Sequence, residues 1–148
     1  MITPPEEIVA DFIKQSIQLH ETYAPAIKEA DRYRKLDIED PMRSNLMDEH
    51  TWKIKEYRKK QKGLCEKYGA RITDHNFSEN QYQSPCCYQG HEVINIRQES
   101  AKKVRVFTKT SIRTYNKKMV FTLELKNDQW CLVKQYRING KKEEAMWW

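Results

Sequence analysis

The chain has 148 residues, of which 39% are hydrophobic and 32% charged, and its formal net charge is +6. This length is typical of one domain with one core, and four Gly and five Pro argue against a long disordered tail. No apolar run approaches the roughly 20 residues that cross a bilayer, and the N-terminal segment MITPPEEIVADF lacks the basic start and apolar run of a secretory signal. We therefore expect a cytoplasmic protein that forms a single domain over residues 1–148.

A helical first half is predicted for residues 1–69. Thr3 is a hydroxyl N-cap candidate, and Pro and Glu follow it at the positions where helices begin, so a helix starts at about Pro4. Pro25 predicts a kink or an interruption in this helix, which then continues over residues 26–36. The first helix has one apolar stripe that must pack against the core, formed by Ile8, Val9, Phe12, Ile13 and Ile17.

A second long helix is predicted over residues 42–68, after a break near Asp40 and Pro41. Gly69 stands where a C-cap glycine belongs. The residues expected to face inward on this helix are Leu46, Met47, Ile54, Tyr57 and Leu64.

The second half, residues 70–148, changes to the two-residue period of strands. Strands are predicted over residues 103–110 and 118–126, and Asn127 and Asp128 then form a turn into a return strand over 129–138. In that return strand Trp130, Leu132 and Tyr136 are expected on one face. The segments 92–98 and 71–77 are weaker strand candidates, and 76–89 is expected to be a loop.

Helices followed by an antiparallel meander is the α+β pattern, in which the helices cover one face of the sheet. The outer face should then be polar. On that expected face we nominate candidate binding residues on physical grounds: Arg105, Arg113, Glu124, Gln135 and Arg137.

No catalytic signature is present: the sequence contains no Gly-rich phosphate loop, G-x-S-x-G or H-E-x-x-H motif. His20 is more typical of a structural or surface histidine than of an acid–base group. A zinc site could be imagined from His75, Cys86, Cys87 and His91, but adjacent cysteines without a C-x₂₋₄-C pair are atypical of one. We therefore name no catalytic residue, metal or cofactor.

Nucleic-acid binding is one reading of the basic charge. Residues 1–70 carry 13 Lys/Arg and 13 Asp/Glu, whereas residues 71–148 carry 14 and 8. The run KIKEYRKKQK over residues 53–62 and the basic strands with Phe107 and Tyr115 could hold phosphates and stack bases. The alternative is a solvated helix face and edge lysines that prevent strand pairing. A positive field also suits an acidic protein partner.

The segments VRVFTKT and MVFTLELKNDQWCLVKQYRINGKK resemble the closing strands of the nuclear-transport-factor-2-like superfamily. The helical start TPPEEIVADFI and the loop before Glu92 make the chain most similar, within that superfamily, to immunity proteins of bacterial Rhs and related polymorphic-toxin systems. The positions that match the closing pattern are Phe121, Leu123, Leu125, Trp130, Leu132 and Arg137.

The resemblance implies a cone-shaped domain, with helices in the concavity of a curved sheet, that binds and neutralises a cognate toxin domain without a cofactor. The protein would act as a monomer or as a homodimer. A blocker of a nuclease would usually be acidic, whereas this chain is basic. Three alternatives follow: the toxin is not a nuclease, the inhibitor docks away from the active site, or it presents local acid from Asp37, Glu39 and Asp40. Other members of the superfamily are isomerases and dehydratases with a pocket inside the cone, so a small-molecule enzyme is the alternative from another class.

The chain ends in Met146, Trp147 and Trp148, an apolar group that is costly to leave in water. We expect it to close the core. A homodimer contact or part of a partner site are the alternatives.

Overall fold

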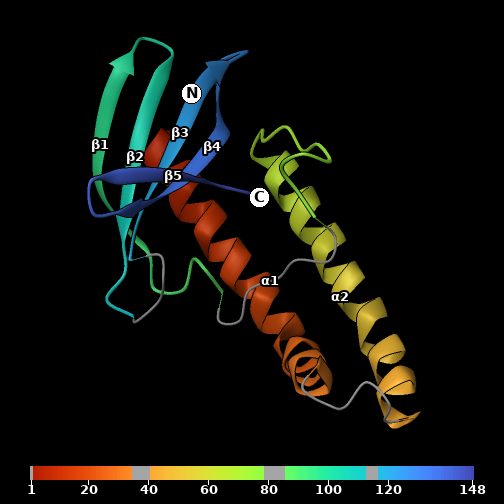
Figure 1. Cartoon of the computed structure of the whole chain (residues 1–148). Coiled ribbons are helices and arrows are strands. Elements are labelled where there is room, and N and C mark those ends of the chain that lie inside the picture. Colours follow the sequence, from red (N-terminus) through yellow and green to blue (C-terminus); the bar gives the residue numbers. More distant parts are fainter. Residues whose placement is uncertain (1, 35–40, 79–85, 113–116) are drawn as a thin grey trace.

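The computed structural model describes residues 2–34, 41–78, 86–112 and 117–148, with all their side chains except those of residues 33, 34 and 41–49. Two helices, α1 (Pro5–Arg34) and α2 (Pro41–Lys67), precede the strands. The strands form one antiparallel sheet in chain order: β1 (Glu92–Ser100), β2 (Lys103–Lys109), β3 (Lys118–Lys126), β4 (Gln129–Asn139) and β5 (Lys142–Met146). The predicted α+β class is confirmed, with the sheet open and the helices on one side of it (Figure 1).

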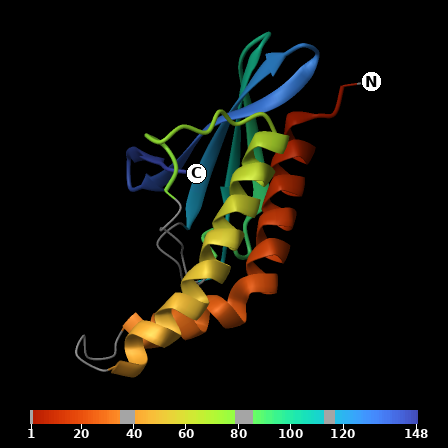
Figure 2. The same cartoon turned by 90° about the vertical axis from the view of Figure 1, so that its right-hand side faces the viewer.

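Helix α1 begins one residue later than predicted and runs through Pro25. The Pro4 carbonyl accepts the first helical bond, from the Ile8 N–H at 3.2 Å, so Pro4 is the cap, Pro5 is the first helical residue and Thr3 is not the N-cap. Figure 2 shows the axis of α1 bending in its final third, which contains Pro25. The proline therefore kinks the helix and does not interrupt it, which was the first of the two predicted alternatives.

The end of α2 confirms the predicted glycine cap. Gly69 has a φ of 92°, its N–H donates to the Glu66 carbonyl at 3.0 Å, and the Ala70 N–H donates to the Cys65 carbonyl at 3.0 Å. This pair of bonds is the Schellman arrangement, which favours glycine because its φ is positive. The weak strand prediction for 71–77 is wrong, since a turn forms there in which the Thr73 N–H donates to Asn76 Oδ1.

The core lies between the N-terminal half of α1 and one face of the sheet. The predicted inward residues of β2 are buried, and they face the buried side chains of Phe12 and Phe121. A second, smaller cluster joins the two helices away from the sheet, where Figure 2 shows the helix pair extending beyond the strands. The members of the second cluster are Tyr23, Ile27, Ile54 and Tyr57.

The faces of β4 differ from the prediction because the strand contains a bulge. Thr122 pairs with Lys134, but its neighbour Leu123 pairs with Leu132, so Val133 is an extra residue in β4. One added residue reverses the alternation of everything that follows it. Leu132 faces the core as predicted, whereas beyond the bulge Gln135 takes the inward place that had been assigned to Tyr136.

Strand β5 was not predicted, and it curls the sheet across its own outer face. Arg105 of β2 forms an ion pair with Glu143 of β5 at 2.5 Å, although two strands separate β2 from β5 in the sheet order. In Figure 1 the β4–β5 hairpin crosses in front of β2 and β3. Val120, on the outer face of β3, is consequently 0% exposed. The expectation of a polar, solvated outer face is wrong for this part of the sheet.

Candidate functional site

Aromatic side chains fill the space between the helices and the sheet. The Phe12 ring is the centre of this cluster, with four rings around it at centroid distances of 5.3–6.2 Å and edge-on angles. Edge-to-face packing of this kind stabilises a core beyond the area that it buries. The side of the sheet that faces the helices is therefore packed with side chains, and the four rings around Phe12 belong to Tyr68, Tyr88, Phe121 and Trp148.

Gln135, nominated as an exposed binding residue, is 2% exposed, so this prediction is wrong. The Tyr88 hydroxyl donates to Gln135 Oε1 at 2.6 Å, and Gln135 Nε2 donates to the Trp147 carbonyl at 2.7 Å. Burial raises the pKa of Tyr88 well above its usual value, so the phenol stays protonated and remains a donor. Gln135 thus connects β4, the segment before β1 and the C-terminal residues.

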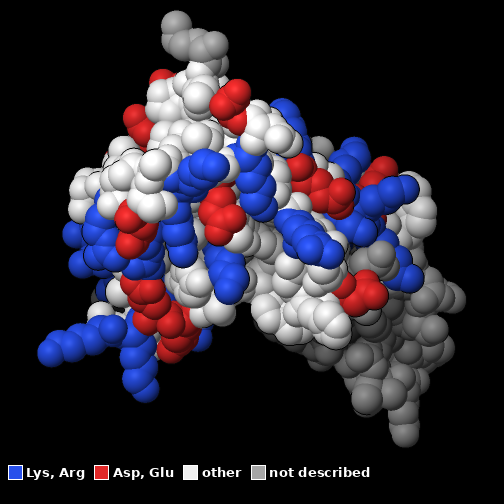
Figure 3. Space-filling view, turned by 90° about the horizontal axis from the view of Figure 1, so that it is seen from above, with Lys and Arg blue, Asp and Glu red and all other residues white. Residues whose placement is uncertain are grey.

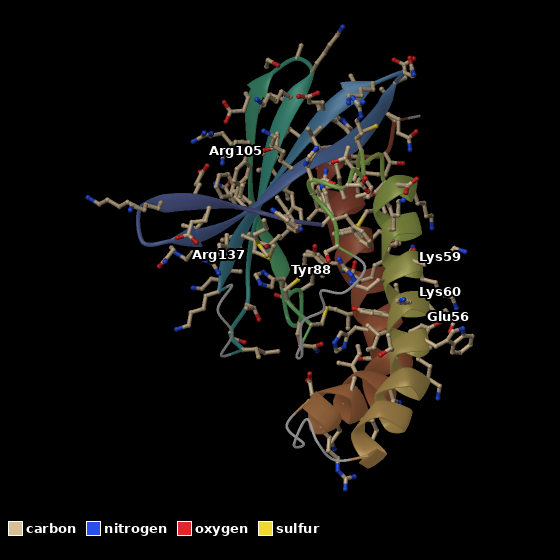
Figure 4. The ribbon with its side chains drawn as sticks, turned by 45° about the vertical axis from the view of Figure 1, so that its right-hand side comes forward. Glu56, Lys59, Lys60, Tyr88, Arg105 and Arg137 are labelled. Atoms are coloured by element: carbon tan, nitrogen blue, oxygen red, sulfur yellow. The ribbon has the colours of Figure 1, made fainter. Side chains whose placement is uncertain are left out.

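Arg105 and Arg137, which lie on the sheet (Figure 4), each form an ion pair with a glutamate of the same protein. The Arg105 side chain is 14% exposed and pairs with Glu143, with its guanidinium 5.6 Å from the Phe107 ring centroid. Arg137 pairs with Glu144 at 2.5 Å and retains 43% exposure. Its strand partner is the buried Met119, so Arg137 lies at the margin of the inward face.

Of the remaining nominated residues, Glu124 is the one that the structure describes. Its side chain is 40% exposed and lies 4.0 Å from the Lys126 ammonium on the same strand. Arg113, Asp37, Glu39 and Asp40 lie outside the described residues. The nominated side chains that the structure describes therefore do not come together in one site.

The basic run on α2 is divided between the core and the solvent. Tyr57 is 2% exposed and Arg58 5%, whereas Lys59 and Lys60 are exposed. Figure 4 shows these two lysines on the side of α2 away from the sheet, so they do not join Arg105 in one basic surface. Seen from above, Lys and Arg are interspersed with Asp and Glu (Figure 3). Mixed charge of this kind dilutes the field that attracts phosphates.

Arg58 joins three segments of the chain. Its Nε donates to the Ser78 carbonyl at 2.8 Å, its Nη2 donates to the Trp148 carbonyl at 3.2 Å, and the guanidinium lies 4.1 Å from the Phe77 ring centroid. Desolvation lowers the pKa of this guanidinium from its ordinary value. Arg58 is a structural clamp, and the buried Trp148 that it holds confirms that the C-terminal residue closes the core, while Trp147 stays 54% exposed.

The titratable groups considered for chemistry have structural neighbours. His20 is 8% exposed and its ring packs edge-on against Tyr57 at 5.9 Å. His91 is buried, with Nδ1 at 2.9 Å from Thr108 Oγ1, and His75 is exposed. A hydrogen bond between the two thiols lowers the pKa of Cys86 and raises that of Cys87. In the described ranges, no three His, Cys, Asp or Glu side chains are placed to share a metal.

The surface formed by the described residues has grooves, and two of them border α1. The first, of about 590 Å³, lies between α1 and α2 and is lined by Lys14, Lys60 and Lys67 together with Asp11 and Gln15. Much of its polar lining is already paired, because Lys67 Nζ donates to Gln15 Oε1, Gln15 Nε2 donates to Asp11, and the Tyr68 hydroxyl donates to Asp11.

The second groove, of about 400 Å³, lies between the start of α1 and β1. Its floor is mostly apolar and its rim has three carboxylates, from Glu6, Glu7 and Glu92. The sequence reasoning did not find this site. The weaker strand prediction for 92–98 is confirmed by β1, but a register shift between Val93 and Asn95 breaks its alternation, so the sequence did not show which of its residues face the groove.

No protein family, curated protein or solved structure was found that matches the chain. Within the described ranges, neither helix has an apolar stretch sufficient to cross a membrane.

Proposed function

We propose that this chain is a cytoplasmic immunity protein that binds and neutralises the toxin domain of an Rhs-type or related polymorphic toxin through a protein–protein contact. Its helices and curled sheet would be a variant of the nuclear-transport-factor-2-like cone that the closing strands resemble. This role requires no catalytic activity of the protein, because covering the partner's functional surface is sufficient to neutralise it.

The observation that carries the proposal is the exposed apolar edge of the sheet. Ile94 and Ile96 on β1 are 56% and 40% exposed, and β1 has a strand partner on one side alone among the described residues. Exposed apolar side chains beside a groove and an unpaired edge are features of protein-binding surfaces.

A small-molecule enzyme, the alternative from the same superfamily, has less support. Such enzymes need a concave pocket that holds a substrate beside paired titratable groups. Here the Phe12 cluster fills the space between the helices and the sheet, where a pocket of that kind would lie. Nucleic-acid binding also has less support, because Arg58 and Arg105 are engaged inside the protein and the exposed lysines of α2 lie apart from the sheet.

The test is co-expression with the C-terminal domain of the adjacent large open reading frame. We expect this domain to arrest growth when expressed alone, and co-expression of the chain to restore growth and to yield a 1:1 complex that survives a salt wash. A folded, soluble chain that neither restores growth nor co-purifies would contradict the proposal and favour a ligand-binding protein. A circular dichroism spectrum recorded first shows that the chain is folded, so that a negative result cannot be due to an unfolded protein.

A further inference from the structure

Strand β1 projects beyond the helices that cover the rest of the sheet. Its partners on β2, Val104 and Val106, are 0% exposed, yet each residue from Ile94 to Ser100 is exposed. Ile96 pairs with Val106 and therefore faces the same side as the core. The apolar inward face of the sheet thus continues past the helices at this edge.

The groove beneath β1 combines an apolar floor with an acidic rim. Ala10, Ile13 and Val93 line it with Ile96, and His91 is also part of its lining. In the described part of the chain, Glu6, Glu7 and Glu92 form no ion pair. Glu6 and Glu7 lie in the first turn of α1, where carboxylates interact favourably with the positive end of the helix dipole, so they also have a structural role. The groove is therefore lined by three carboxylates on a protein of net charge +6, with Lys109 as the strand partner of Glu92.

Two register shifts flank the available edge, one between Val93 and Asn95 and one between Gln98 and Ser100. Such bulges disfavour pairing along a whole edge strand, which protects the free protein from aggregation. They leave residues 95–98 in regular register. An added strand could therefore pair over a short length, and its specificity would come from side chains that enter the groove.

We propose that β1 and the groove beneath it receive an extended segment of the partner protein, in which apolar side chains alternate with Lys or Arg. This inference rests on the proposed function and names the partner surface that it requires. Charge complementarity selects the partner: the carboxylates of the rim attract cations, whereas the rest of the protein repels them. A toxin domain that binds phosphates would present such a basic strand, so a basic immunity protein can block it through this acidic groove.

The experiment measures binding of the purified toxin domain from the adjacent reading frame by titration calorimetry. Ile96→Arg, which places a cation on the apolar floor, is expected to weaken binding at least 100-fold. The double variant Glu6→Lys, Glu7→Lys is expected to weaken it at least tenfold and to reduce its salt dependence. Trp52→Arg is the matched control, because Trp52 is 64% exposed on α2, away from β1, and its affinity should equal that of the wild type.

Four results would overturn the inference. Tight wild-type binding that Ile96→Arg leaves unchanged refutes the β1 site while the proposed function survives, and loss of binding in Trp52→Arg would move the site to α2. Absence of wild-type binding refutes the proposed function and this inference together. A dimer of the chain alone, in light scattering, that Ile96→Arg dissociates would assign the edge to a second copy. Circular dichroism of each variant confirms folding, which substitutions at exposed positions should preserve.

Discussion

Replacement of Arg58 by Met should lower the free energy of unfolding by about 2–4 kcal/mol. Met fills much of the same space but has no donor, so the carbonyls of Ser78 and Trp148 lose their partner. Each buried acceptor left unpaired costs about 1–3 kcal/mol, and the lost contact with the Phe77 ring adds about 0.5–2 kcal/mol. Removal of a desolvated charge offsets part of this cost, which keeps the sum in the stated range.

Urea denaturation followed by tryptophan fluorescence measures this loss, since Trp148 lies in the core. Lys59→Met is the matched control on the same helix: Lys59 is exposed, so its replacement should change stability by no more than about 0.5 kcal/mol. A double-mutant cycle of Arg58→Met with Phe77→Leu should show a coupling of about 0.5–2 kcal/mol. Equal stability of the Arg58 and Lys59 variants would refute the clamp.

Three further predictions test the fold in the same denaturation assay. Gly69→Ala should destabilise the protein by more than about 1–2 kcal/mol, because φ is 92° and the new Cβ would lie 2.5 Å from Cys131 Cβ. Gly63→Ala, with open space around it, should instead stabilise the protein by about 0.5–1 kcal/mol. Stability changes of the same sign in both variants would refute this prediction. Gln135→Leu should cost about 2 kcal/mol or more, because the Tyr88 hydroxyl and the Trp147 carbonyl lose their partner, and a cost near zero would contradict the buried network. Burial raises the pKa of the Cys65 thiol from 9.0 to about 12, so the folded state keeps a proton that the unfolded chain loses, and stability should fall as the pH rises from about 9 toward 12, by about 1.4 kcal/mol at pH 10. Cys65→Ala should reduce this slope, and an unchanged slope would refute the assignment.

The sequence by itself determined where the helices and most of the strands lie. Local periodicity is sufficient for this, because a side chain every 3.6 or every two residues must reach the same core. Val104, Val106 and Phe121 are buried as their alternation predicted, and Gly69 caps α2 because the chain needs a positive φ there. A signal for β5 was also present, in the Asn139 and Gly140 pair that favours a hairpin turn, but the sequence reasoning did not use it.

Only the tertiary structure decided which polar residues are buried and which apolar residues are exposed. The bulge at Val133 turned Gln135 inward, and no local pattern of alternating residues records an inserted one. Arg58 is buried inside a run of lysines because its partners, Ser78 and Trp148, are far away in the sequence. Ile96 is exposed because α1 covers only the start of β1 and leaves the residues from Ile94 onward exposed. Each outcome depends on contacts between distant segments, and those contacts also define the groove that we propose as the partner site.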